Sequence, residues 1–93
     1  MSPEKAMIDV NQETIDKVAA IAKLADDKIM YWVRRGGEHS ERMHSLWGSV
    51  YIGAHELGCL FISGPSKQVD EVFVRFAADY KTAKRVETEI AAR

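Results

Sequence analysis

The sequence predicts an all-α fold, a three-helix bundle that associates into an oligomer. Two glycine-marked breaks, Gly36-Gly37 and Gly64-Pro65, divide the chain into segments of similar length at about 10–35, 39–63 and 66–92. Apolar residues recur every three or four positions in each segment, which is the period of an amphipathic helix. The chain is 46% hydrophobic and 29% charged, a composition typical of a globular domain.

The length of 93 residues predicts a single domain. We expect residues 1–9 to be a flexible N-terminal segment and residues 10–93 to form one helical domain. A chain this short buries only about 60–65% of the surface that it exposes when unfolded. A monomer would therefore have modest stability, and association would add to it.

The first segment, 10–35, carries helix signals at both of its ends. Asn11 is a good N-cap, and Arg34 and Arg35 complement the negative end of the helix dipole. Gly36 can adopt the positive φ that closes a helix. One apolar stripe runs along the segment and consists of Ile15, Val18, Ala22, Ala25, Ile29, Trp32 and Val33.

The middle segment allows two interpretations. As a helix, it places one apolar face at Met43, Leu46, Trp47, Val50, Ala54, Leu57 and Phe61. The alternative is an α+β fold, in which two long helices flank a β-hairpin at about 49–63. Gly48, Gly53 and Gly58 would each cost a helix about 1 kcal/mol relative to alanine. Three helices of similar length could nevertheless pack along their whole length, so we favour the helix.

The third segment, 66–92, is again amphipathic. Its apolar stripe consists of Val69, Val72, Phe76, Tyr80, Ala83, Val86 and Ile90. Arg75 stands four positions from both Glu71 and Asp79, a spacing that predicts salt bridges within the helix.

More apolar residues are present than the inward faces of three helices require. The surplus residues are Tyr51, Ile52, Leu60, Ile62, Phe73 and Val74. Surplus apolar surface on a small domain usually marks an interface. We expect these residues to contact a second copy of the chain, which gives a homo-oligomer, or another protein. The function predicted from this surplus is a non-enzymatic interaction protein of the inhibitor or adaptor type, which docks on or blocks a partner macromolecule.

A second hypothesis is an oligomeric binder of a phosphorylated or nucleotide-like small molecule. Arg34, Arg35 and Arg42 lie close together in the sequence, and Trp32 precedes them. Guanidinium groups bind phosphate and aromatic rings stack on bases. No phosphate-loop or dinucleotide-binding pattern supports this hypothesis.

A third hypothesis is a metal-binding protein that uses His55 and Cys59, which share a helix face. Zinc requires three or four ligands, and the sequence offers just these two in a defined relation. The simpler interpretation is a half-buried histidine beside an inert, packed cysteine. We therefore expect no metal site, no catalytic residue and no cofactor.

The charge balance and the single cysteine limit the classes of partner and the cellular compartment that we expect. Thirteen basic and 14 acidic side chains give a net charge of −1, which argues against a nucleic-acid partner. A single cysteine fits a reducing compartment, so we expect a cytoplasmic protein. The apolar stretch 46–62 contains His55, Glu56 and three glycines. We therefore interpret it as buried protein and expect no membrane partner.

Overall fold

A computed structural model of the chain describes residues 10–63 and 66–92. Its helices are α1 (Gln12–Arg35), α2 (Ser40–Ser63) and α3 (Ser66–Ala91). They pack as a compact bundle, with no strand among the described residues, which confirms the predicted fold class.

The alternative with a β-hairpin at about 49–63 is wrong, because this stretch is the continuous second half of α2. Periodicity and matched helix length outweigh the cost of three glycines in this segment. The expected flexible segment at 1–9 and the break at Gly64-Pro65 lie outside the described residues.

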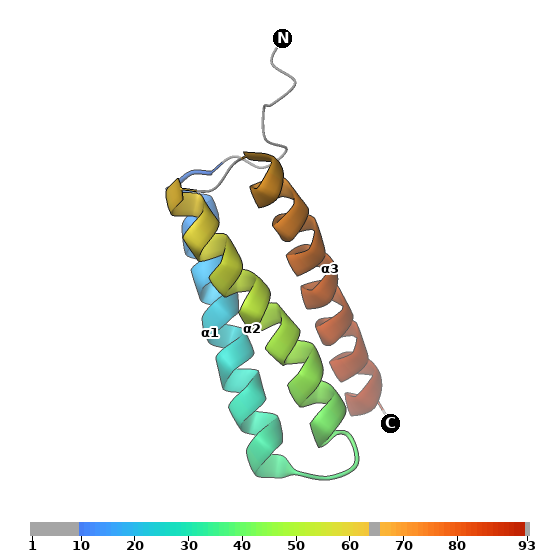
Figure 1. Ribbon diagram of the computed structural model, residues 1–93. Coiled ribbons are helices and arrows are strands. Elements are labelled where there is room, and N and C mark those ends of the chain that lie inside the picture. The colour runs from blue at the N-terminus through green and yellow to red at the C-terminus, as the bar shows by residue number, and fades with distance from the viewer. Residues whose placement is uncertain (1–9, 64–65, 93) are drawn as a thin grey trace.

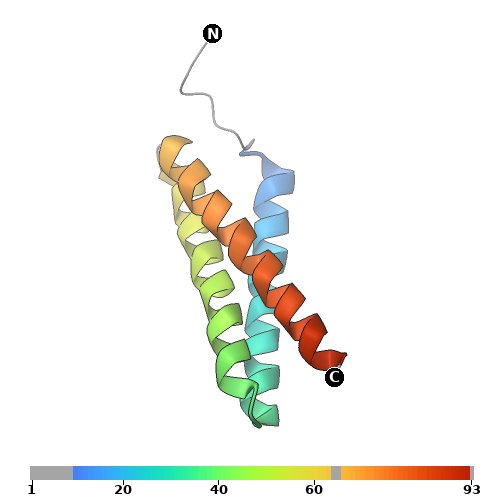
Figure 2. The same ribbon diagram turned by 90° about the vertical axis from the view of Figure 1, so that its right-hand side faces the viewer.

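The helices α1 and α2 form an antiparallel pair, and α3 lies across one side of that pair (Figures 1 and 2). The backbone of α2 approaches both α1 and α3 closely, whereas α1 and α3 do not approach each other in this way. The opposite side of the α1/α2 pair has no helix over it within the described part of the chain (Figure 1).

Both ends of α1 adopt the predicted caps. Asn11 Oδ1 accepts a hydrogen bond of 2.9 Å from the backbone N–H of Thr14. Gly36 has a φ of 64°, and its N–H donates to the carbonyl oxygen of Trp32 at 3.0 Å. The hydroxyl of Ser40 donates to the same carbonyl at 2.7 Å, which ties the first turn of α2 to the end of α1.

The core is built from the predicted stripes. Its buried members are Val18, Ala25, Trp32, Met43, Trp47, Val50, Ala54, Leu57, Val69, Val72, Phe76, Ala83 and Val86. Two members of the α1 stripe are more exposed than predicted, Ile15 at 36% and Val33 at 54%. Both lie toward the side of the stripe that α3 does not cover, so their exposure follows from the position of α3.

Of the three glycines in α2, Gly53 has a packing reason within the chain. A Cβ at this position would lie 3.3 Å from Cδ1 and 3.4 Å from Cβ of Phe76. The absent side chain therefore lets α3 approach α2 at this point. A Cβ at Gly48 or Gly58 would meet no atom of the described chain within 4 Å.

Side chains rather than backbone hold α1 to α3. Glu87 on α3 accepts a hydrogen bond from Trp32 Nε1 at 2.8 Å. Its other carboxylate oxygen lies 2.8 Å from Lys28 Nζ. Arg75 links α3 to α2 in a similar way, since its Nη2 donates to both carboxylate oxygens of Glu56 at 2.9 and 3.0 Å.

Within residues 10–63 and 66–92, no helix combines the length and the apolar character that crossing a bilayer requires.

Candidate functional site

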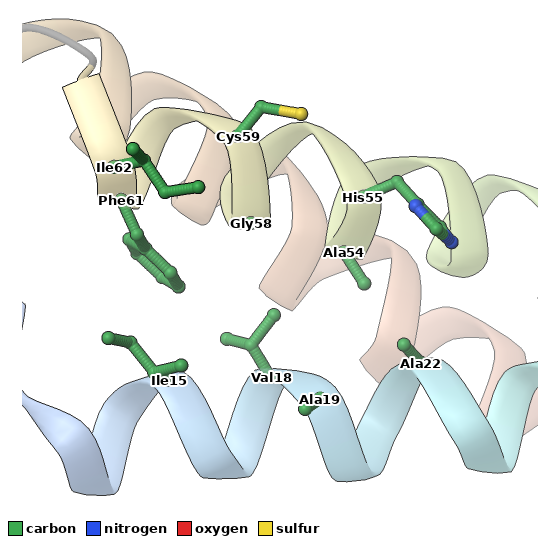
Figure 3. A pocket seen from close by; sticks show the side chains of 10 residues that line it. All are labelled: Ile15, Val18, Ala19, Ala22, Ala54, His55, Gly58, Cys59, Phe61 and Ile62. Carbon is green, nitrogen blue, oxygen red and sulfur yellow. The ribbon is translucent and has the colours of Figure 1, made fainter.

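An apolar groove lies between the N-terminal half of α1 and the C-terminal half of α2 (Figure 3). It is open to solvent and has a volume of about 370 Å³. The residues that line it are Ile15, Val18, Ala19, Ala22, Ala54, His55, Gly58, Cys59, Phe61 and Ile62. Nearly all are apolar, so the groove suits an apolar side chain better than a charged ligand.

Small residues on both helices create this groove. Ala19 and Ala22 form part of the α1 wall, and Gly58 stands on the α2 wall. Larger side chains close the end of the groove, where Ile15 and Phe61 reach toward each other across the gap (Figure 3). The space is therefore a consequence of residue size along two otherwise regular helices.

A shallow hollow adjoins the groove on the outer side of α2. It is lined by Tyr51, Ile52, His55, Glu56 and Cys59. His55 and Cys59 line both the hollow and the groove, so the two surfaces are continuous. We call their combined surface the α1/α2 outer face. Its residues are Ile15, Ala19, Ala22, Tyr51, Ile52, His55, Gly58, Cys59 and Ile62.

Two isoleucines project from the α1/α2 outer face. Ile62 is 87% exposed and Ile52 is 60% exposed. The ring of His55 packs against Tyr51, with 4.5 Å between the ring centroids. Among the described residues that line the groove and the hollow, the charged side chain is Glu56, which accepts hydrogen bonds from Arg75 of α3.

The predicted interface residues do not all lie on one surface. Tyr51, Ile52 and Ile62 belong to the α1/α2 outer face. Leu60 and Phe73 are half-buried and pack against the core. Val74 is 53% exposed on α3, and helical periodicity turns it away from the core positions of that helix.

The arginines of the predicted ligand site line three different hollows. Arg34 and Arg35 share a hollow with Asp27. Arg42 lies in another with Glu38 and Glu41. Each hollow therefore contains a carboxylate that competes with an anionic ligand for the guanidinium groups.

Trp32, the aromatic residue of the same prediction, is 4% exposed. Its N–H is bonded to Glu87, and the guanidinium of Arg35 lies over its ring, 5.3 Å from the centroid. These three residues line one hollow with Lys28. The indole is thus already covered by the protein's own side chains.

The metal hypothesis rests on His55 and Cys59, which lie next to each other on the α1/α2 outer face. Both are exposed, so the interpretation as a half-buried histidine and a packed cysteine is wrong. Cys59 points away from α1 in Figure 3. No group of three or more His, Cys, Asp or Glu side chains that could hold a metal occurs within the described residues.

Sequence reasoning missed the α1 wall of the groove. Ile15 and Ala22 were assigned to the core stripe, and Ala19 was assigned to no site. The available signal was the pairing of small residues on two helices predicted to be neighbours. Small residues of this kind predict a groove between two helices once the pairing of those helices is known.

The α1/α2 outer face is thus an apolar surface that runs from the groove to the hollow. A three-helix bundle does not by itself identify a function, because unrelated proteins share such folds. Comparison with protein-family models, curated proteins and solved structures gave no match to this chain.

Proposed function

We propose that this protein is a non-enzymatic interaction domain that docks on another protein chain through the α1/α2 outer face. The observation that carries the proposal is the exposure of Ile62, 87%, at the edge of an apolar groove. An isoleucine side chain gains about 1.5–3 kcal/mol on full burial. Covering Ile52 and Ile62 would therefore contribute several kcal/mol to binding.

The position of Gly58 also supports the proposal of a docking site on this face. A glycine inside a helix costs about 1 kcal/mol relative to alanine, and nothing in the described chain fills the space beside it. A partner side chain that enters the groove at this point would use the space that a Cβ would occupy. The domain would thus act as an adaptor or an inhibitor, by bridging or covering its partner.

Site-specific photocrosslinking tests this proposal. A photoreactive amino acid replaces Ile62 in one variant and Val74 in another, and both full-length variants are expressed in the protein's native cells. Val74 is a matched control, because it is an exposed aliphatic residue on α3 that lines neither the groove nor the hollow. Irradiation should give a discrete protein adduct from position 62 and none from position 74. Equal adducts from both positions, or none from either, would refute the proposal.

A further inference from the structure

We infer that His55 and Cys59 are half of a zinc site, and that a second copy of this protein, packed antiparallel on the α1/α2 outer face, supplies the other half. The site rests on the proposed function and deepens it, because it identifies the docking partner and adds a metal ion that joins the two chains. Zinc takes four ligands in tetrahedral geometry, and two cysteines with two histidines are a common set. Two copies of this pair provide that set.

His55 and Cys59 can reach one metal ion from α2. They stand four positions apart, so their Cβ atoms lie about 6 Å apart on one side of the helix. Both side chains are exposed, and the sulfur of Cys59 points along α2 toward the His55 end (Figure 3). The pair leaves two positions of a tetrahedral zinc ion unfilled.

The described part of the same chain offers no third ligand beside this pair. Glu56 is the carboxylate next to His55 in the sequence, but both of its oxygens accept hydrogen bonds from Arg75, at 2.9 and 3.0 Å. His44 is also exposed on α2, but it lies about 17 Å along the helix from His55. A second chain must therefore supply the remaining ligands.

A site built from two identical pairs carries no net charge. Each cysteine binds as a thiolate and releases its proton to solvent, whereas each histidine binds as a neutral imidazole. Two thiolates balance the charge of Zn²⁺. Because burial is costly for groups that carry a net charge, a neutral complex suits a position between two apolar faces.

The exposed isoleucines of α2 are placed symmetrically about the metal-binding pair. Ile52 precedes His55 by three residues and Ile62 follows Cys59 by three, so the isoleucines and the ligands share a midpoint at residue 57. A twofold axis at this level, perpendicular to α2, brings His55 level with Cys59 of the partner subunit. All four ligands then lie within about 3 Å of the axis, measured along the helices.

The same axis places a projecting side chain against a hollow. Ile62, which is 87% exposed, comes level with Tyr51 and Ile52 of the partner subunit. These two residues line the hollow on the outer side of α2, which has a volume of about 300 Å³. Each Ile62 can therefore enter the hollow of the other copy, and the two apolar faces cover each other.

The register across the groove places α1 relative to the axis. Ile15 lies across the groove from Ile62, and Ala22 lies across it from His55 (Figure 3). Because α1 and α2 are antiparallel, these pairs make residue 57 level with residue 20 of α1. The axis therefore passes through the α1 wall of the groove, which runs from Ile15 to Ala22.

Two charged residues of α1 are complementary about this axis. Asp16 and Lys23 are seven residues apart, nearly two full turns, and both are exposed on the side of the helix that carries Ala19. Their midpoint lies between residues 19 and 20. Asp16 therefore comes level with Lys23 of the partner subunit, and the second such contact follows from the symmetry.

The present partners of these charged groups leave them available to the second copy. Lys23 Nζ and Asp27 Oδ2 are 3.7 Å apart, with side chains 80% and 64% exposed, and exposed pairs of this kind contribute little to stability. Asp16 accepts a hydrogen bond of 2.7 Å from the neutral amide of Gln12. Asp26 comes nearly level with Gln12 of the partner subunit, whose second amide N–H can donate to its carboxylate.

The contact between the two chains is small. The part of α2 from residue 51 to the end of the helix overlaps with the partner, so the shared face is about 20 Å long and about 20 Å wide. Such a face buries about 400 Å² per copy, half of the roughly 800 Å² per partner of a standard stable interface. Association of the two copies therefore depends on the metal.

Zinc-dependent association of the full-length protein tests the inference. Sedimentation velocity under reducing conditions should show a monomer after treatment with EDTA, and a dimer after addition of half an equivalent of zinc chloride per chain. Native mass spectrometry should find one zinc ion in each dimer. Cobalt chloride in place of zinc should give the intense visible absorption of a tetrahedral site with thiolate ligands.

Variants of the ligands test which residues hold the metal. Cys59→Ser and His55→Asn should each abolish the zinc-dependent dimer, with circular dichroism to confirm folding. His44→Asn is the matched control, because it removes another exposed histidine of α2, about 20 Å from the axis, and should dimerise as the wild type does. A Cys59→Ser chain that still dimerises with zinc, or a wild-type dimer that persists in EDTA, would overturn the metal site.

A charge exchange tests the antiparallel arrangement. Asp16→Lys and Lys23→Asp each make two attractive contacts repulsive, so each variant alone should form the zinc dimer about tenfold less readily than the wild type. An equimolar mixture should recover wild-type affinity as a heterodimer, because opposite charges again face each other. A mixture that associates no better than its components would overturn the arrangement.

A wild-type chain that stays monomeric in the presence of zinc would overturn the shared site. In that case a discrete photoadduct from position 62 with a different protein would still support the proposed function. If no photoadduct formed either, the proposed function would be refuted as well.

Discussion

Alanine substitutions at two glycines of α2 should change stability in opposite directions. Gly58→Ala adds a methyl group where no atom of the described chain lies within 4 Å. Gly53→Ala adds the same group 3.3 Å from Cδ1 of Phe76. The helix propensity gained is the same in both variants, so their difference isolates the contact between α2 and α3.

The structure sets the size of each effect. Alanine gains about 0.5–1 kcal/mol over glycine inside a helix, which should raise the Tm of Gly58→Ala by about 2–8 °C. At Gly53 this gain is opposed by overpacking, which costs about 1–3 kcal/mol. Phe76 is 2% exposed, and its Cβ lies 3.4 Å from the new methyl group. The ring cannot swing into solvent, so we expect a net loss of about 1 kcal/mol.

Thermal unfolding followed by circular dichroism measures both variants beside the wild type. The protein concentration must be low, because self-association would add its own stabilisation. A Gly53→Ala chain as stable as Gly58→Ala would show that α3 yields at this contact. The close approach of α2 and α3 at Phe76 would then not be the reason for the glycine.

The remaining predictions concern the contact between α1 and α3 and the α1/α2 outer face. Glu87→Ala leaves the buried N–H of Trp32 without an acceptor and should lower the free energy of unfolding in urea by about 1–3 kcal/mol. Glu87→Gln keeps an acceptor and should lower it less, so equal losses from the two variants would contradict the role of the hydrogen bond. Ile62→Asp should change the unfolding free energy by less than about 0.5 kcal/mol, because the side chain is 87% exposed, yet it should abolish the protein adduct formed by a photoreactive amino acid at position 52. An undiminished adduct would exclude Ile62 from the docking surface. Gly48→Ala should raise the free energy of unfolding by about 0.5–1 kcal/mol, because a Cβ at this position meets no atom of the described chain within 4 Å, and a loss of stability would contradict this packing.

Local sequence patterns predicted the helices well, because the interactions that begin, end and orient each helix join residues close together in the sequence. The side chain of Asn11 caps α1 three residues away, and Gly36 closes it within one turn. The apolar period of each segment places Trp47 and Leu57 in the core whatever the neighbouring helix is. These signals need no knowledge of how the helices are arranged.

Side-chain contacts between different helices could not be predicted from the same local patterns. Spacing predicted that Arg75 pairs with Glu71 or Asp79 on its own helix. In the structure its guanidinium binds Glu56 on α2, 19 residues away in the sequence. Which of several nearby carboxylates an arginine reaches depends on the relative rotation of two helices, and no local pattern encodes that rotation.

The candidate site shows the same difference between what local patterns predict and what the helix arrangement decides. Ile52 and Val74 both lie outside the predicted apolar stripes, and both were predicted to be interface residues. They differ because Ile52 lies beside a continuous apolar hollow, whereas Val74 stands on α3, outside both the groove and the hollow. A surplus of apolar residues therefore predicts that a surface exists, and the position of the third helix decides which members of the surplus share it. For this reason a side chain such as Val74, exposed but separate, is the most informative control for a binding surface inferred from exposure.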